Sequence, residues 1–206
     1  MENSRLEQLF LSVQKPGRYS GGEMGSVYKD KSKVDVRFAF CFPDTYEIGM
    51  SHLGMKILYG LFNERDDIWC ERVFAPWTDF EKVMREENIP LFALESRDPI
   101  SEFDFIGFTL QYELSYTNVL NMLQLGGIPL KSKDRVDLTP LVVAGGPCAC
   151  NPEPLADFVD IFFLGEGEEV DLEVIDLYKK CKKEGKTKAE FLREASTIKG
   201  VYVPEL

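Results

Sequence analysis

Apolar, β-prone runs alternate with amphipathic helical patterns along most of this chain. The run VRFAFCF (36–42) precedes the helical pattern of 49–64, and IWCERVF (68–74) precedes that of 78–89. The same patterns predict further strands over 90–96, 103–110, 141–146 and 160–167, and helices over 112–127 and 151–159. Strands joined through helices form crossover connections, which favour parallel pairing. The sequence therefore predicts a doubly wound α/β fold, Rossmann-like or flavodoxin-like, with a mostly parallel sheet.

The two ends of the chain depart from this alternation. Residues 1–33 combine an amphipathic opening with a Gly- and Ser-rich stretch, which predicts an N-terminal helix and loop extension. Residues 34–180 are expected to form the α/β domain. Near the C-terminus, helical patterns cover 168–185 and 188–198, and GVYVPEL suits a final strand. We treat residues 181–206 as a helix and strand that follow the domain.

Composition and charge restrict the classes of partner. The formal net charge is −11, whereas binding to a phosphate backbone needs clustered Lys and Arg, so nucleic acid is not expected as the main partner. No apolar run approaches the roughly 20 residues of a membrane span. The opening MENSRLEQLF lacks the layout of a secretory signal, which predicts a cytoplasmic location.

The cysteines do not suggest a metal site. The chain has five, at positions 41, 70, 148, 150 and 181, and in a cytoplasmic protein this odd number indicates reduced thiols. Cys148 and Cys150 form a lone Cys-x-Cys in a chain with one histidine, which is a weak zinc signal. No metal ligands are therefore predicted.

Polar residues and glycines gather where the predicted strands end. Parallel sheets bind ligands outside the carboxyl ends of their strands, so these positions are the candidate ligand site. They are Thr45, Tyr46, Glu47, Gly49, Ser51 and His52 after the first run, Thr109, Gln111, Tyr112 and Glu113 near the end of 103–110, Gly145, Gly146 and Pro147, and Gly165, Glu166 and Gly167. A glycine lets a large ligand lie against the backbone, although a glycine pair also suits a tight turn.

Common nucleotide motifs are missing from this set. The first strand is not followed by Gly-x-Gly-x-x-Gly, and no Gly-x-x-x-x-Gly-Lys-Ser/Thr occurs, which disfavours NAD and ATP. The segment 43–47, PDTYE, is too acidic to hold the phosphate of FMN. A flavodoxin-like redox or nucleotide-binding protein therefore remains only a distant alternative.

Three segments carry a family resemblance. FCFPDTYEIGMSHLGMKILYGLFN, FDFIGFTLQYELSYTNVLNML and VVAGGPCACNPEPLADFVDIFFLGEGEE resemble the N-terminal cobalamin-binding-type domain of a family of radical S-adenosylmethionine (SAM) proteins. The resemblance covers about residues 34–180. It implies that the domain binds cobalamin and precedes a barrel that holds a [4Fe-4S] cluster and SAM. That barrel is expected as the C-terminal partner, beyond residues 181–206, and the resemblance does not identify a substrate.

The resemblance also assigns roles to individual residues. Gly145 and Gly146 match the glycine pair that lines the tunnel for the nucleotide tail of cobalamin, and Thr109 matches a strand-end hydroxyl that bonds this tail. The segment Gly165–Gly167 would border the corrin ring. His52 lacks the Asp-x-His-x-x-Gly context of a cobalt ligand, and a histidine in the first turn of a helix often bonds the backbone there instead.

Nothing in the sequence pairs a nucleophile with a base, so no catalytic residue is predicted and the chain alone is not expected to catalyse a reaction. The leading interpretation is a domain that positions cobalamin or substrate for the barrel. The main alternative is a degenerate domain that kept the fold, lost cobalamin and serves substrate recognition or contacts between domains. Absorbance after addition of cobalamin would separate the two.

Overall fold

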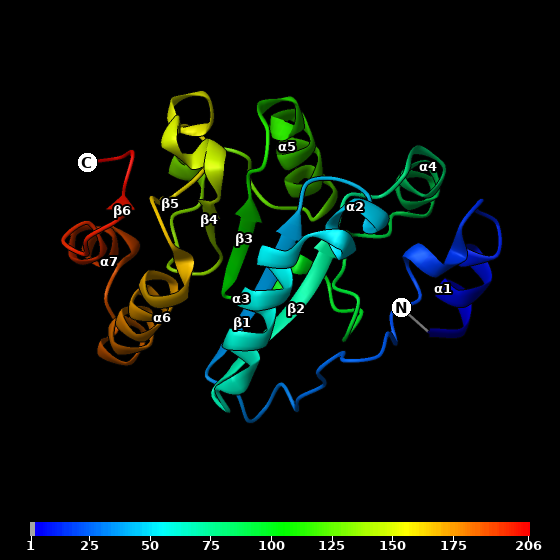
Figure 1. The fold of residues 1–206 in the computed structure, drawn as a ribbon, viewed down its shortest axis with the longest axis horizontal. Helices are drawn as coiled ribbons and strands as arrows, with labels where there is room; N and C mark the ends of the chain where they lie inside the picture. Colours follow the sequence, from blue (N-terminus) through cyan, green and yellow to red (C-terminus); the bar gives the residue numbers. More distant parts are fainter. Residues whose placement is uncertain (1–2) are drawn as a thin grey trace.

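A computed structural model describes residues 3–206 and shows a six-stranded sheet with helices on both faces (Figure 1). The strands run in the order β2-β1-β3-β4-β5-β6, all parallel except β6. Their bounds are β1 Val36–Phe42, β2 Ile68–Phe74, β3 Phe105–Thr109, β4 Leu141–Gly145, β5 Ile161–Phe163 and β6 Val201–Tyr202. The predicted α/β class with a mostly parallel sheet is confirmed. Residues 1 and 2 of the predicted extension lie outside the described residues.

Seven α-helices lie around this sheet in the described part of the chain. They are α1 Asn3–Phe10, α2 Tyr46–Ser51, α3 Leu53–Glu64, α4 Thr78–Glu87, α5 Tyr116–Leu125, α6 Gly167–Glu184 and α7 Lys188–Ala195. Local sequence explains several boundaries. Asn88 and Gly185 adopt left-handed conformations that end α4 and α6, and Thr187 with Glu190 forms a capping box that begins α7.

The sheet separates two apolar cores. Strand β1 is buried along its whole length, and its side chains alternate between the two faces. Phe38 and Phe40 point to the face covered by α3, α6 and α7, where Met55, Tyr59 and Phe62 form the buried stripe of α3. Residues such as Ala39 and Cys41 point to the opposite face, which α1, α4 and α5 cover.

The strand predicted over 90–96 does not form. The segment instead runs beside the edge of β2, joined to it by a backbone bond from Leu94 N–H to the Arg72 carbonyl at 2.9 Å. Outside the named strands, an isolated antiparallel bridge joins Phe92 to Pro99. Arg97 adopts a left-handed φ of 63°, which turns the chain back before a ladder can develop.

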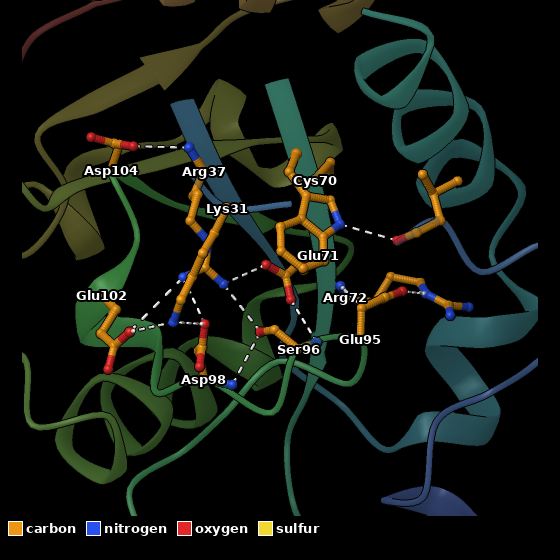
Figure 2. A network of polar contacts seen from close by, with 12 residues as sticks. Lys31, Arg37, Cys70, Glu71, Arg72, Glu95, Ser96, Asp98, Glu102 and Asp104 are labelled. Atoms are coloured by element: carbon orange, nitrogen blue, oxygen red, sulfur yellow. Dashed lines mark hydrogen bonds and ion pairs between the residues drawn. The ribbon is translucent and has the colours of Figure 1, made fainter. Parts of the chain in front are cut away.

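Carboxylates take the place of that missing ladder, as Figure 2 shows. Glu95 accepts the backbone N–H of Arg72 at 2.8 Å and the guanidinium Nε of the same residue at 2.6 Å. Glu71 accepts the N–H of Ser96 at 2.8 Å. On the neighbouring strand β1, the Arg37 guanidinium pairs with Glu71 at 2.5 Å. The edge strand is thereby covered by buried ion pairs instead of a further strand.

Three helical predictions also need correction. The helix predicted over 49–64 is two helices, α2 and α3, separated at His52. The helix predicted over 112–127 begins at Tyr116, after a 3₁₀ turn over Glu113–Ser115. Over 151–159 the structure has only a 3₁₀ turn, at Glu153–Leu155, with Pro152 as its N-cap and Pro154 in its first turn.

The C-terminal segment continues the sheet. Helix α6 runs without a break through residue 180, and β6 pairs antiparallel with β5. A backbone bond from Leu164 N–H to the Gly200 carbonyl, at 2.7 Å, extends this pairing. Among residues 3–206, no helix has both the length and the apolar character to cross a membrane.

Candidate functional site

A cavity opens at the carboxyl ends of β1, β3, β4 and β5. It has a volume of about 530 Å³ and extends between α3 and α6 down one face of the sheet. Nine of the residues predicted from the sequence line it: His52, Thr109, Gln111, Gly145, Gly146, Pro147, Gly165, Glu166 and Gly167. Residues from all four predicted strand ends therefore meet at one site, as expected for the carboxyl edge of a parallel sheet.

The floor of the cavity is apolar and partly aromatic. Phe38, Phe40, Val143 and Phe163 contribute to it from the strands. Gly107, in the middle of β3, allows this arrangement, because a Cβ at that position would lie 2.4 Å from Cζ of Phe38. The bare backbone of Gly107 therefore lets an aromatic ring lie across the sheet.

The glycines at the rim have different structural roles. Gly146 has a φ of +98°, and a Cβ there would lie 2.9 Å from the Leu110 carbonyl oxygen. Its backbone conformation therefore requires glycine. A Cβ at Gly145 would lie 3.6 Å from Cβ of Phe163, which is an ordinary contact. Gly145 accordingly keeps the cavity open without being required by the backbone.

Thr109 and Gln111 supply neutral polar groups at the end of β3. Thr109 is buried, and the Gln111 amide donates to its Oγ1 at 2.6 Å. Both residues line the cavity. A hydroxyl and an amide can exchange hydrogen bonds with an uncharged ligand without a large desolvation cost.

His52 is the N-cap of α3. Its Nδ1 accepts the backbone N–H of Met55 at 3.1 Å, and its ring packs 5.4 Å from that of Phe42. When Nδ1 accepts a hydrogen bond, the proton of a neutral imidazole lies on Nε2, so this nitrogen has no lone pair for a metal. The sequence expectation of a backbone hydrogen bond in the first turn of this helix is met.

Asp171 is a cavity residue that sequence reasoning missed. It lies on α6, is only 7% exposed, and its Oδ1 is buried without a hydrogen-bond partner among the described residues. Burial, and secondarily the charge of Glu168, raises the pKa of this carboxyl group to about 8. A signal was present, because Asp171 shares a helical face with the buried Val174, Ile175 and Tyr178.

The charge of the cavity is one-sided. Its lining includes three carboxylates, Glu166, Glu168 and Asp171, and contains neither lysine nor arginine. The two glutamates are exposed at the rim, whereas Asp171 is buried. The site therefore suits a ligand that offers hydrogen-bond donors and has little negative charge.

The structure places seven predicted site residues outside this lining: Thr45, Tyr46, Glu47, Gly49, Ser51, Tyr112 and Glu113. Most of them follow β1, where the chain enters α2 directly. Gly49 is buried under two phenylalanines, since a Cβ there would lie 2.3 Å from the ring of Phe74. Ser51 donates its hydroxyl to the Glu47 carbonyl at 2.8 Å.

Ion pairs and hydrogen bonds account for several of these side chains. Glu47 pairs with Lys15 and Arg18, both at 2.9 Å, and these contacts lower its pKa to about 2. The Tyr112 hydroxyl donates to Asp44 at 2.9 Å. A role for the seven residues in ligand binding stays a prediction.

All five cysteines are free thiols, and Cys150 is exposed at the cavity. Within residues 3–206 no group of three or more His, Cys, Asp or Glu side chains is arranged to hold a metal ion.

Comparisons with known proteins support a family assignment. The family model described as radical SAM proteins, N-terminal, matches residues 54–204, well over half of the chain. An uncharacterized protein of Methanocaldococcus jannaschii is 29% identical over 147 residues, which are 70% of this chain and 27% of that protein. The chain thus spans about a quarter of this relative's length. No solved structure shows significant similarity.

Proposed function

Because the chain belongs to the family of radical SAM proteins, N-terminal, we propose that it binds cobalamin in the cavity between α3 and α6. The observation that carries this proposal is the bare backbone of Gly145 and Gly146 at the opening of the cavity, above an apolar floor. Residues 34–180 would form the binding domain, and a radical SAM barrel would be its C-terminal partner.

The residues of the cavity fit the chemistry of cobalamin. The aromatic and aliphatic floor suits the base at the end of the nucleotide tail, and Gly145 leaves room beside Phe163. Thr109 and Gln111 would bond the polar parts of the tail. Glu166, at the rim, would accept hydrogen bonds from the amide groups around the corrin ring. His52 would remain the cap of α3 and not a cobalt ligand.

The residues of this chain would hold cobalamin, and the reaction itself would be carried out by the cofactors. Cobalamin, when bound, supplies methyl transfer, and the [4Fe-4S] cluster and SAM of the barrel supply radical chemistry. The residues of this chain would bind and orient the cofactor and exclude water from its tail. None of them is assigned a catalytic role.

A second function is favoured by the state of His52. Because its Nδ1 lone pair is used within α3, the domain has no histidine ready for cobalt. This suits a degenerate domain that recognises a substrate or braces the barrel without a corrinoid. The two proposals differ in whether the purified chain binds cobalamin.

Titration of the chain with methylcobalamin and hydroxocobalamin, followed by visible absorption, tests the proposal. We expect saturable binding at micromolar concentration and a shift to the base-off spectrum. Gly145→Leu should abolish binding, because its side chain would fill the cavity from a position where a Cβ is tolerated. Gly146 is less suitable, since its φ of +98° would strain any side chain.

Gly60→Leu is the matched control. Gly60 lies on α3 outside the cavity lining, and a Cβ there meets no atom within 4 Å. This variant should bind cobalamin like the wild type. Absence of binding by the wild-type chain would refute the cobalamin proposal and leave the recognition domain. Equal binding by Gly145→Leu would refute the assignment of cobalamin to this cavity.

A further inference from the structure

We propose that the carboxyl group of Asp171 recognises a nitrogen heterocycle in the cavity and shares one proton with a ring nitrogen. The inference rests on the proposed function to the extent that this heterocycle is the base of cobalamin's tail. It extends that proposal by assigning a specificity-determining residue to the interior of the cavity, in addition to its glycine rim.

The first support is a buried carboxyl group that no cation of the described residues neutralises. Buried carboxylates elsewhere in the chain have partners: Glu71 pairs with Arg37, and Asp160 with Arg135. Asp171 is more than nine-tenths buried, and its Oδ1 has no partner among the described residues. A group that costs stability in the free protein and borders a cavity is suited to a ligand.

The second support is the local space around the carboxyl group. A Cβ on Gly167 would lie 2.9 Å from Oδ2 of Asp171, so glycine is the residue that leaves this oxygen uncrowded. Gly167 and Asp171 both line the cavity. The first turn of α6 therefore provides space next to the carboxyl group.

The third support is the shape and polarity of the opposite wall. Phe38, Phe40 and Phe163 present aromatic surface from the sheet, which suits a flat ring. No lysine or arginine lines the cavity, so the lining offers Asp171 no cationic partner, and a ligand can supply one. A carboxyl group held largely protonated by burial can donate to the lone pair of a ring nitrogen, and it can equally accept from a protonated one.

Two sources could provide such a ring: the dimethylbenzimidazole of cobalamin or the base of a nucleoside. The experiment uses the full chain as wild type, Asp171→Leu and Asp171→Asn. Methylcobalamin is compared with cobinamide, a corrinoid without the nucleotide and its base. We expect Asp171→Leu to weaken methylcobalamin binding about tenfold or more and to leave cobinamide binding unchanged.

Asp176→Asn serves as the matched control, because Asp176 is an exposed aspartate of the same helix, outside the cavity lining. Its affinity for methylcobalamin should equal that of the wild type. Thermal unfolding checks that the variants fold: removal of an unpartnered carboxyl group should raise the unfolding midpoint of Asp171→Leu, whereas a supporting structural residue would lower it.

The outcomes separate the two proposals. Equal loss of both corrinoids, or no loss of either, would overturn the role of Asp171 while cobalamin binding stands. If the wild type binds neither corrinoid, the cobalamin proposal fails, and NMR titration with dimethylbenzimidazole and adenosine decides the inference. If the wild type binds dimethylbenzimidazole or adenosine and Asp171→Leu does not, the role of Asp171 is supported and that compound identifies the source of the ring. If the wild type binds neither compound, the role of Asp171 is overturned.

Discussion

Asp171 is the residue at which the fold and the proposed site conflict most. A buried carboxyl group without a partner costs stability, and native chains keep few such groups. The rest of α6 satisfies its pattern, with apolar residues on the buried face and charged residues outside. An exception of this kind is expected at a functional position, since binding sites often sacrifice stability.

Asp171 should make stability depend on pH. Its pKa in the folded chain is about 8, above the ordinary 3.8, so the folded state holds the proton more tightly. Tighter proton binding by the folded chain adds to the free energy of unfolding. This proton-linked contribution is complete below about pH 4 and is lost as the pH rises toward 8. We therefore compare the free energies of unfolding of wild type and Asp171→Asn in urea. The difference in favour of the variant should grow by at least about 1 kcal/mol between pH 5 and pH 8.

The comparison of the two proteins removes the contributions of other groups, such as Glu71 and Glu95, whose pKa values burial also raises. A constant difference between the variant and the wild type across this range would show that Asp171 titrates normally.

Arg37 presents the opposite case, a buried charge that is paired with carboxylates through both terminal nitrogens of its guanidinium. Its guanidinium contacts Glu71 at 2.5 Å and Asp98 at 2.9 Å (Figure 2). It also lies 4.1 Å from the ring centroid of Phe103. Arg37→Met would leave Glu71 buried without its cation, and we expect a loss of about 3–5 kcal/mol in the free energy of unfolding.

The double variant Arg37→Met, Glu71→Met tests the reason for that loss. If the unpaired charge is responsible, the double variant should recover most of the stability in urea unfolding. A double variant as unstable as the single one would instead indicate lost packing of the guanidinium.

At the scale of elements, His52 determines where α2 ends and α3 begins. His52→Ala would leave the backbone N–H of Met55 without its acceptor and should cost about 1 kcal/mol in urea unfolding. His52→Asn, which can accept the same bond, should retain most of the stability. If cobalamin binds, neither variant should change its visible spectrum; a spectral change would make His52 a cobalt ligand.

At the scale of the whole molecule, topology explains the position of the cavity. The connection from β1 to β2 places α3 on one face of the sheet, and the connection from β3 to β4 places α5 on the other. Helices α3 and α6 therefore cover the outer strands of their face, and the centre of that face stays open over β1, β3 and β4. Strand order reverses there, between β1 and β3, where ligands of such sheets bind.

Ligand binding in this cavity should stabilise the entire domain. Methylcobalamin at about 100 times its dissociation constant should add roughly 2.7 kcal/mol to the free energy of unfolding, since it binds only the folded chain. The unfolding midpoint of Gly60→Leu should rise in the same way, and that of Gly145→Leu should not. A similar rise in Gly145→Leu would place the ligand outside the cavity.

The sequence by itself determined the class of fold and the loops that meet at the site. The runs at 36–42 and 68–74 match β1 and β2 residue for residue, because both are rich in the apolar, β-prone residues that a buried strand needs. The glycines of 145–146 and 165–167 could be placed at one edge, since parallel strands end together. These are consequences of local pattern and of rules common to all such sheets.

Only the tertiary structure decided which polar residues face the cavity and which are engaged elsewhere. Glu47 lies in a predicted site loop but pairs with Lys15 and Arg18, which are distant in sequence. The segment 90–96 has a strand-like pattern, yet buried carboxylates bind it to β2. Asp171 looks like one more helical charge until α6 packs against the sheet. Burial and partners are properties of the packed chain, and they determine what a side chain can bind.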